Sequence, residues 1–364
     1  MSGSCIGNIF KVTTWGESHG KGLGVVVDGC PAGIELNEEI IQLDMDRRRP
    51  GSTKYGTKRS EGDKIQILSG VFEGKTTGTP ISMAVFNENQ LSKDYSNIAH
   101  VYRPGHADMG FSEKFGFRDY RGGGRSSGRE TLARVAAGAI ARQILKELGI
   151  NIYAYSKSIG DIEISNFDLK QRDLNPLYMP DEEAYKKASE LLDRAIKNCN
   201  SVGGVVECCV EGLPIGIGEP VFDKLDSSLA KAILSIGAVK GIEFGLGFNA
   251  SKSYGNINND NMYMENGKIK KYTNNSGGIL GGMSDGSTVV FRAAFKPTPS
   301  IAQPQKTVTD SGEETEIIIK GRHDPIIVPR AVVVVEAMTA ITLVDLLLLN
   351  MSSKMDNIKK FYTL

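Results

Sequence analysis

The stretch "RSSGRETLARVAAGAIARQILKELG", residues 125–149, predicts a helix that lies inside the protein. Ser127 and Glu130 stand three positions apart at its start. This is the spacing of a capping box, in which the serine oxygen accepts an early backbone N–H and the glutamate reaches back. Gly149 is suited to end the helix. Alanine and glycine recur in between and would let a neighbouring element pack closely, so we expect a buried helix over 129–148.

The segment just before this helix gathers arginines and glycines in "RDYRGGGR", residues 118–125. The whole chain has 43 Lys+Arg and 43 Asp+Glu, so this positive charge is local. Unpaired N–H groups and the helix dipole attract anions at a helix start, and glycines let a ligand approach the backbone. We interpret the segment as an anion site. A solvated surface loop is the structural alternative.

A second basic cluster follows a predicted helix over 37–48, in "DRRRPGSTKYGTKR", residues 46–59. The three consecutive arginines end that helix, where cations also suit its dipole. Lys54, Lys58 and Arg59 follow on a loop of small polar residues. Two such clusters would suit an anionic substrate that carries more than one charge.

Hydrophobic patterns predict strands in groups, with helices between the groups. Strands are expected over 24–27, 65–71, 81–86, 204–210, 288–294 and 331–335, and further helices over 181–197, 222–236 and 336–350. The steady alternation of a parallel α/β sheet is missing from this order. The fold class is therefore predicted as α+β, in layers.

The longest apolar stretch, 326–349, is interrupted by Arg330, Glu336 and Asp345, which disfavours a membrane span. It is interpreted as the buried strand 331–335 running into a buried helix. The segment 253–275 is expected to be a mobile surface loop with a hairpin tip at Asn266-Gly267. The tail 351–364 is expected to be solvated, and residues 1–364 to form one domain.

The cysteines indicate a reduced compartment. There are five, an odd number without CxxC spacing, and Cys208 and Cys209 are expected to pack rather than pair. The N-terminus lacks the pattern of a secretory signal. Zero net charge argues against a general nucleic-acid binder.

Two of the four histidines stand among small residues that would leave the imidazole open to a ligand. They are His19 in "GESHG" and His106 in "RPGHAD", and each could act as a general acid near neutral pH. No metal-ligand spacing occurs, so no metal site is predicted. The segment "KPTPSI", 296–301, offers donors suited to a phosphate but matches neither a P-loop nor a dinucleotide-binding motif.

Several of these segments resemble the conserved blocks of the chorismate synthase family. They occur in family order between residue 7 and about residue 338, and they are "TWGESHG", "DRRRPG", "GVFEGKTTGTPI", "RPGHAD", "RDYRGGGRSSGRET", "GGILGG", "KPTPSI" and "GRHDP". The resemblance implies a lyase that eliminates phosphate from 5-enolpyruvylshikimate 3-phosphate to give chorismate, with a requirement for reduced FMN. It also implies a single-domain sandwich with central helices between antiparallel β-sheets, a homotetramer and a cytoplasmic location.

The resemblance further implies roles for individual residues. His19 would assist departure of the substrate phosphate, His106 would help hold the reduced flavin, and Asp324 would act near flavin N5. The residues implied to bind the substrate are Arg48, Lys54, Ser127 and Arg129. Those implied to line the flavin are Arg125, Ser126, Ser127, Gly237, Ala238, Gly281, Lys296, Pro297, Thr298, Pro299, Ser300 and Arg322.

The chain departs from the family pattern at two positions. Lys54 stands where many members have Arg, which keeps the charge but loses the planar guanidinium. Gly237 stands where Asn, Gln or Pro is common. Two alternatives to the lyase stay open from the residues alone: a flavin or nucleotide binding protein without lyase chemistry, and an RNA-binding module that uses the Arg-Gly stretch. The source of reduced flavin is also open, between the chain's own use of NADPH and an external flavin reductase, which is favoured.

Overall fold

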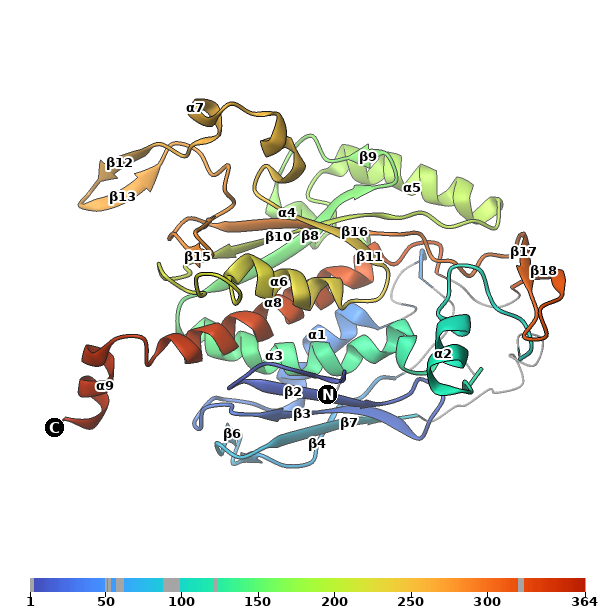
Figure 1. The fold of residues 1–364 in the computed structure, drawn as a ribbon, viewed down its shortest axis with the longest axis horizontal. Coiled ribbons are helices and arrows are strands. Elements are labelled where there is room, and N and C mark those ends of the chain that lie inside the picture. The colour runs from blue at the N-terminus through green and yellow to red at the C-terminus, as the bar shows by residue number, and fades with distance from the viewer. Residues whose placement is uncertain are drawn as a thin grey trace.

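Two antiparallel sheets form the outer layers of the protein, and helices fill the space between them (Figure 1). The computed structural model describes residues 3–49, 51, 54–56, 62–87, 99–120, 123–319 and 324–363. The first sheet has the strand order β1 (Cys5–Ile6), β2 (Lys11–Gly16), β3 (Gly22–Asp28), β7 (Ile81–Phe86) and β4 (Gln66–Ile67). The second has the order β11 (Val239–Phe244), β16 (Val289–Phe295), β10 (Gly204–Glu211), β8 (Asn151–Ile159) and β9 (Ile162–Glu163).

The central layer consists of four helices: α1 (Glu38–Arg48), α3 (Thr131–Glu147), α6 (Leu225–Leu234) and α8 (Val328–Asn350). Helix α3 packs against the first sheet, and α6 and α8 pack against the second. Helices α3 and α8 lie against each other, so their contact joins the two halves into a single hydrophobic core. The predicted α+β arrangement, with helices between antiparallel sheets, is confirmed.

Small residues let α3 and α8 approach closely. A Cβ added to Gly138 of α3 would lie only 2.3 Å from the Cβ of Ala337 in α8. Residues of α8 from Val328 to Leu346 are buried almost without interruption, so this helix is apolar all round. Among the described residues it is the one helix long and apolar enough to cross a membrane, and most of it is buried inside the protein.

The prediction of a strand over 331–335 was wrong, because these residues form part of α8. Valine has a local preference against helix, which costs up to about 0.7 kcal/mol per residue relative to the best helix formers. Burial of each valine side chain between the two sheets contributes about 1.5–3 kcal/mol and outweighs that preference. Pro329 in the first turn suits a helix start.

Other predicted elements agree with the structure within a few residues, except for one strand, and several strands, among them β2, β8 and β11, were not predicted. The strand expected over 65–71 is divided into β4 and β5 (Val71–Phe72), and β5 pairs with β6 (Lys75–Thr76) in a small hairpin. Strand β8 was not predicted, although it pairs with β10 along its whole length. The five cysteines are free, and Cys208 and Cys209 are buried as expected.

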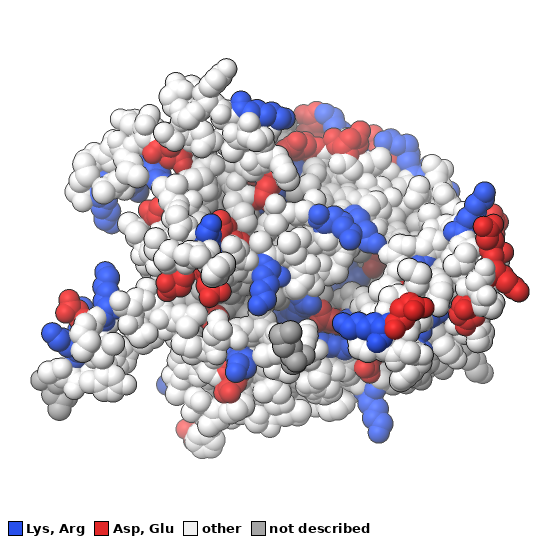
Figure 2. All heavy atoms as spheres, viewed as in Figure 1, with Lys and Arg blue, Asp and Glu red and all other residues white. Residues whose placement is uncertain are grey.

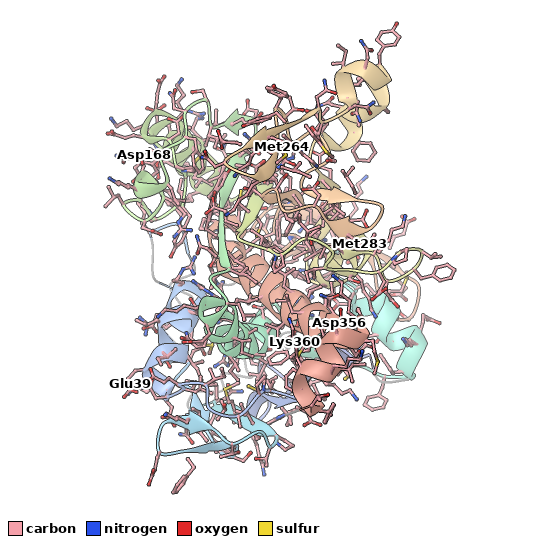
Figure 3. The ribbon with its side chains drawn as sticks, turned by 90° about the vertical axis from the view of Figure 1, so that its left-hand side faces the viewer. Glu39, Asp168, Met264, Met283, Asp356 and Lys360 are labelled. Carbon is pink, nitrogen blue, oxygen red and sulfur yellow. The ribbon has the colours of Figure 1, made fainter. Side chains whose placement is uncertain are left out.

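The segment expected to be a mobile loop contains regular structure. It follows the 3₁₀ turn η4 (Gly247–Lys252) and holds α7 (Gly255–Asn258) and the hairpin of β12 (Met262–Glu265) and β13 (Lys268–Lys271). Asn266 and Gly267 form the hairpin tip with φ of 51° and 75°, which confirms that prediction. In the tail, α9 (Met355–Tyr362) has no buried residue, and Figure 3 shows its Asp356 and Lys360 on the outside of the molecule.

The remaining elements are short connections and peripheral helices. They are α2 (Asp108–Phe115), the 3₁₀ turns η2 (Gly124–Ser126) and η3 (Gly128–Glu130), α4 (Leu169–Arg172), α5 (Glu182–Lys197), and the strand pairs β14 (Ile279–Leu280) with β15 (Met283–Ser284) and β17 (Pro304–Val308) with β18 (Glu314–Ile318).

Candidate functional site

The ends of four central helices meet in one region. Arg48, the last residue of α1, points Nη1 at the carbonyl oxygen of Gly128, which begins η3, at a distance of 3.5 Å. Arg330 in the first turn of α8 donates to the main-chain oxygen of Arg48 at 2.9 Å. Arg134 of α3 reaches Ser235, just after α6, at 2.6 Å. The positive ends of α3 and α8 therefore lie beside the negative ends of α1 and α6.

A buried carboxylate joins two of the predicted substrate-binding arginines. Asp63 Oδ2 accepts from Arg48 Nη2 at 2.7 Å, and Asp63 Oδ1 accepts from Arg129 Nη2 at 2.7 Å. We call Arg48, Asp63 and Arg129 the Asp63 cluster. Its side chains are almost completely inaccessible to solvent. Charge-assisted bonds of this kind fix the planar guanidinium groups in orientation as well as position.

The electrostatic environment of the Asp63 cluster shifts the pKa of Arg48 and of Asp63. Burial lowers the pKa of Arg48, as does the positive charge of Arg330, while Asp63 opposes both, and the result is a pKa of about 10. Burial alone would raise the pKa of Asp63, but the charges of Arg48 and Arg129 outweigh it and hold that pKa below its usual range.

His19 is buried next to the Asp63 cluster, on the loop between β2 and β3. Its Nδ1 lies 2.9 Å from the hydroxyl of Ser18. Arg129 Nη1 donates to the carbonyl oxygen of Ser18 at 3.2 Å, so the same arginine contacts both Asp63 and the histidine loop. The Asn87 amide donates to the carbonyl of Gly20 at 2.6 Å and its oxygen accepts from Arg129 at 2.6 Å.

Asp324 reaches the same region through Arg330. Its Oδ2 accepts from Arg330 Nη1 at 2.6 Å, and the same guanidinium donates through Nε to the main-chain oxygen of Arg48. Asp324 is mostly buried in this pair. The structure therefore brings together His19, Arg48, Arg129 and Asp324 from four separate segments of the sequence.

A second group of predicted residues meets around the segment 296–300. His106 Nε2 lies 2.8 Å from Ser300 Oγ, and Lys296 Nζ donates to the carbonyl of Gly105 at 2.7 Å. The backbone N–H of Lys296 donates to the carbonyl of Ala238, which is held at a φ of 74°. Burial, and then the nearby charge of Lys240, lower the pKa of Lys296. Figure 2 shows several Lys and Arg side chains over the middle of the face that is turned toward the viewer in Figure 1.

The Arg-Gly segment lies between the two groups. Arg125 donates to the hydroxyl of Thr14 at 2.6 Å and to the carbonyl of Gly16 at 3.1 Å, next to the loop of His19. On the other side, a Cβ at Gly123 would lie 3.9 Å from Arg103 Nη2, on the segment that carries His106. The Arg-Gly segment therefore lies near both the loop of His19 and the segment that carries His106.

Only half of the predicted capping box forms. Ser127 accepts from the backbone N–H of Arg129 at 3.4 Å, as a cap should. The carboxylate of Glu130, however, accepts from Arg134 Nε at 2.7 Å, one turn further along α3. A charged partner on the same helix face is a stronger attraction for a carboxylate than a backbone N–H, so Glu130 does not reach back. Ser126 is exposed and donates to the carbonyl of Gly123.

Two predicted residues, Lys54 and Gly281, do not join these groups. Lys54 is exposed, lies over the ring of Tyr55 and pairs loosely with Asp193 at 3.5 Å. Gly281 lies in the β14–β15 turn beside the start of α6, where Gly282 accepts from the N–H of Leu225. Gly237 and Ala238 follow the opposite end of that helix. Arg322 lies outside the described residues, as do Arg59, Lys58, Arg121 and His323.

Three residues that organise the site were not assigned in the sequence analysis. They are Asp63, Asn87 and Arg330. Asp63 and Asn87 stand in polar segments without a recognisable motif. Arg330 interrupts an apolar run in the sequence and belongs to no motif. A charged residue in so apolar a stretch is itself a signal, because an arginine enters a core helix only with a partner.

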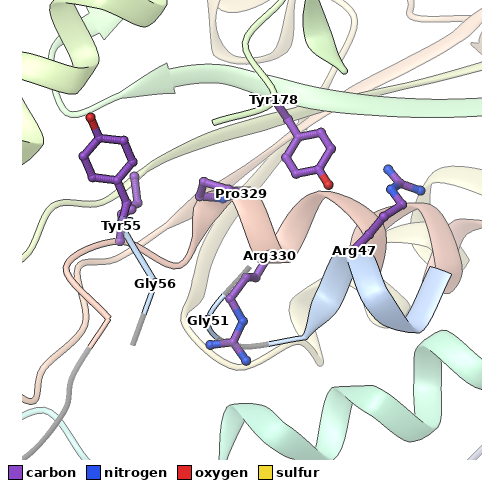
Figure 4. Close-up of a pocket in the computed structure, with 8 residues that line it drawn as sticks. Arg47, Gly51, Tyr55, Gly56, Tyr178, Pro329 and Arg330 are labelled. Atoms are coloured by element: carbon purple, nitrogen blue, oxygen red, sulfur yellow. The ribbon is translucent and has the colours of Figure 1, made fainter. Parts of the chain in front are cut away.

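Two of the hollows among the described residues are lined by no predicted flavin residue. The first has a volume of about 10 Å³, room for about one water molecule, between the end of α1 and the start of α8. Figure 4 shows Arg47, Tyr55, Tyr178, Pro329 and Arg330 around it. The second, of about 500 Å³, is an open hollow beside α4 and α5 with several acidic residues, which would not attract an anion.

Comparison with known proteins gives a consistent result. Residues 10–348 match the family model of chorismate synthase. The chain is 65% identical to the chorismate synthase of Agathobacter rectalis over 364 residues, covering 100% of this chain and 99% of that protein. It is 65% identical over 365 residues to that of Lachnoclostridium phytofermentans, covering 100% of both.

A crystal structure of chorismate synthase has the same fold. It superposes with a TM-score of 0.75 at 31% sequence identity, covering 98% of this chain and 96% of that one. The family model, the full-length relatives and the solved structure thus agree over nearly the whole chain. The chain belongs to the chorismate synthase family.

Proposed function

We propose that the region around the Asp63 cluster and the segment 296–300 is the active site for the family reaction. As a member of this family, the enzyme converts 5-enolpyruvylshikimate 3-phosphate to chorismate and phosphate in the shikimate pathway. The substrate carries a phosphate and carboxylates, and it loses the phosphate as an anion. A site for this reaction therefore has to supply fixed positive charge where negative charge develops.

The observation that carries the proposal is the convergence of Arg48 and Arg129. These side chains come from different segments, are buried and have one carboxylate between them. Among the described residues, Arg48 Nε has no hydrogen-bond acceptor. A buried donor without an acceptor is costly, and an anionic ligand would satisfy it. Counted over the described residues, with Arg330 and Asp324 included, three positive groups face two negative ones, which leaves one positive charge for the substrate.

We assign the substrate-binding residues as Arg48, Arg129, Ser127 and Lys54. The first three lie within the region just described. Lys54 would have to exchange its exposed pair with Asp193 for the substrate, and its flexible ammonium would act as a point charge rather than a planar fork. We therefore expect Lys54 to contribute less to the affinity for the substrate than Arg48.

Three residues are proposed to take part in catalysis. His19 would donate a proton to the leaving phosphate, because its imidazole lies beside Arg129 on the loop that this arginine contacts. His106 would hold a proton close to the flavin edge, with Ser300 fixing its ring. Asp324, oriented by Arg330, would act near flavin N5 in the removal of the hydrogen.

The residues around Lys296 suit the flavin that the family requires. Among the described residues, the buried Thr298 Oγ1 has no hydrogen-bond partner, so this segment offers an unused polar group. Lys296 adds a cation for a phosphate or for an anionic ring. Reduced FMN, when bound, supplies electron density as the phosphate leaves. The proposed flavin residues are Arg125, Ser126, Ser127, Gly237, Ala238, Gly281, Lys296, Pro297, Thr298, Pro299, Ser300 and Arg322.

Further properties are proposed on the family resemblance. The enzyme would act as a homotetramer in the cytoplasm, with residues 1–364 as one domain. Its FMN would be reduced by an external flavin reductase, with NADPH as the indirect electron source. These properties are independent of the residue assignments above, and gel filtration with light scattering would test the tetramer directly.

The deciding experiment is an anaerobic assay with reduced FMN and 5-enolpyruvylshikimate 3-phosphate, in which chorismate is followed by its absorbance. The wild-type protein should form chorismate, and Arg129→Ala should raise KM strongly. A flavin-binding protein without lyase chemistry would bind FMN and form no product. An RNA-binding module would bind RNA with steep salt dependence. Wild-type KM in the Arg129 variant would exclude the proposed site.

A further inference from the structure

We propose that Asp63 is a positioning residue for the reaction: its carboxylate sets the spacing and orientation of the guanidinium groups of Arg48 and Arg129, so that both address one substrate anion. The inference rests on the proposed function, because it takes these two arginines as substrate ligands. It adds a residue that none of the motifs marks. Asp63 would act through the arginines and would not touch the reacting atoms.

The carboxylate uses each oxygen for a different arginine. Oδ2 accepts from Arg48 Nη2 at 2.7 Å, whereas Oδ1 accepts from Arg129 Nη2 at 2.7 Å and from Nε at 3.3 Å. The Asp63 side chain has no solvent-accessible surface. A carboxylate held in this way fixes two planar groups relative to each other, which a water molecule or a single neutral acceptor would not do.

The backbone around Asp63 is anchored to the helix that carries Arg48. The side chain of Gln42, in α1, donates to the carbonyl oxygen of Asp63 at 3.4 Å and accepts from the N–H of Ile65 at 3.1 Å. Asp63 itself has a φ of 41°, in the left-handed region that aspartate tolerates better than most residues. Helix α1 therefore positions both the carboxylate and one of its two arginines.

Arg129 transmits this position to the histidine loop. Its Nη1 donates to the Asn87 side-chain oxygen at 2.6 Å and to the carbonyl of Ser18 at 3.2 Å. The same asparagine donates to the carbonyl of Gly20. A shift of Arg129 would therefore also move the loop that holds His19, so the spacing set by Asp63 reaches the proposed proton donor.

Charge gives a second reason for the carboxylate. Arg48, Arg129 and Arg330 face one another from α1, η3 and α8, and Asp324 pairs with the last of them. Without the charge of Asp63, the two buried guanidinium groups would repel each other and separate. If Asp63 instead competed with the substrate for the arginines, its removal would tighten substrate binding. The two cases predict opposite changes in KM.

The test compares Asp63→Asn with Asp345→Asn in the full-length enzyme, assayed anaerobically with reduced FMN. Asp345 is a matched control, because it is also a buried carboxylate but accepts from the backbone N–H groups of Asn8, Ile9 and Phe10 near the far end of α8. Both variants should lose thermal stability. Asp63→Asn should raise KM about tenfold or more with a smaller change in kcat, and Asp345→Asn should keep KM within about twofold.

A second variant separates position from charge. Asp63→Glu keeps the charge and moves the carboxylate by one methylene. If Asp63 positions the arginines, KM should be raised in this variant too. If Asp63 only balances their charge, KM should be normal. Because the apparent KM rises when part of the sample is reversibly unfolded, KM is compared only at temperatures where thermal melts show every variant to be fully folded. A lowered or unchanged KM in Asp63→Asn, or a normal KM in Asp63→Glu, would overturn the inference. If Arg129→Ala also left KM unchanged, the proposed site itself would be wrong.

Discussion

The imidazole Nε2 of His106 lies 2.8 Å from the hydroxyl oxygen of Ser300, although 194 positions separate the two residues along the chain. A second contact, from Lys296 Nζ to the carbonyl of Gly105, joins the same two segments. The loop of His106 and the phosphate-suited segment 296–300 therefore hold each other in place. This pairing supports the assignment of both segments to the flavin side of the proposed active site.

Replacement of His106 by alanine is predicted to lower kcat at least about tenfold, the lower part of the range for a general acid or base. The fold should survive, because His106 is only partly buried. His100→Ala is the matched control, since His100 is exposed and pairs with Asp310 at the surface. Anaerobic turnover and circular dichroism of both variants would check this. Wild-type turnover in His106→Ala would remove the residue from the catalytic assignment.

The sequence predicted the charged loops of the site better than the residues that connect them. Glycines, prolines and arginines stand close together in the segments of Arg125 and Lys296, so local chemistry marks them. Asp63 meets Arg129 across 66 positions of sequence, and nothing in its own neighbourhood indicates that pairing. Long-range pairing between single polar residues depends on the complete fold and leaves no periodic pattern.

The secondary structure that was missed has a similar cause. In β8, Ile152 and Ala154 are buried on one face, but Tyr155 on the other face is buried as well. The clean alternation that identifies a half-exposed strand is therefore absent. For the valines of 331–335 a strand was predicted where the structure has a helix, because burial in α8 outweighs their local preference.

Replacement of Glu336 by glutamine is predicted to destabilise the fold by about 3–5 kcal/mol. Glu336 is fully buried in α8 and accepts from Arg47 at 2.6 Å and from the N–H of Ala154 at 2.9 Å. The variant would leave the Arg47 guanidinium without its buried counter-charge. Urea unfolding at neutral pH measures the loss. Exposed Glu190→Gln on α5 is the control and should stay within about 0.5 kcal/mol of wild type.

The same carboxylate predicts part of the acid sensitivity. Burial would raise the pKa of Glu336, but the charge of Arg47 outweighs it and the pKa is lowered. Its contribution is therefore present above about pH 4.3, the ordinary glutamate pKa, and is lost as the pH falls further. The stability difference between wild type and Glu336→Gln should shrink below that pH. A difference that stays constant down to acid unfolding would contradict this account.

Asp181 is predicted to make the start of α5 sensitive to acid. Its side chain accepts from the N–H groups of Glu183 and Ala184 within the helix and of Ser165 outside it. Burial opposes ionisation, but these hydrogen bonds outweigh it and lower the pKa to about 2. The stabilisation, about 2 kcal/mol, is present above about pH 4 and is lost between there and about pH 2.

Asp181→Asn measures this contribution, because asparagine keeps a cap oxygen but cannot ionise. Urea midpoints of wild type and variant should differ at pH 6 and converge as the pH falls toward 3. Asp168→Asn is a suitable control, since Asp168 caps the short helix α4 at an exposed position and should change stability less. Equal midpoints at pH 6 would show that the Asp181 charge contributes nothing.

Gly138→Ala in α3 is predicted to destabilise the protein, although alanine in a helix is normally favoured over glycine by about 1 kcal/mol. The new Cβ would lie 2.3 Å from the Cβ and 2.5 Å from the Cα of Ala337, so α3 and α8 would have to move apart. Overpacking of this kind costs about 1–3 kcal/mol. Gly110→Ala in α2 is the matched control, because nothing lies within 4 Å of a Cβ there. Urea unfolding should show opposite signs for the two variants, and a stabilised Gly138→Ala would mean that the two central helices are not in direct contact at this point.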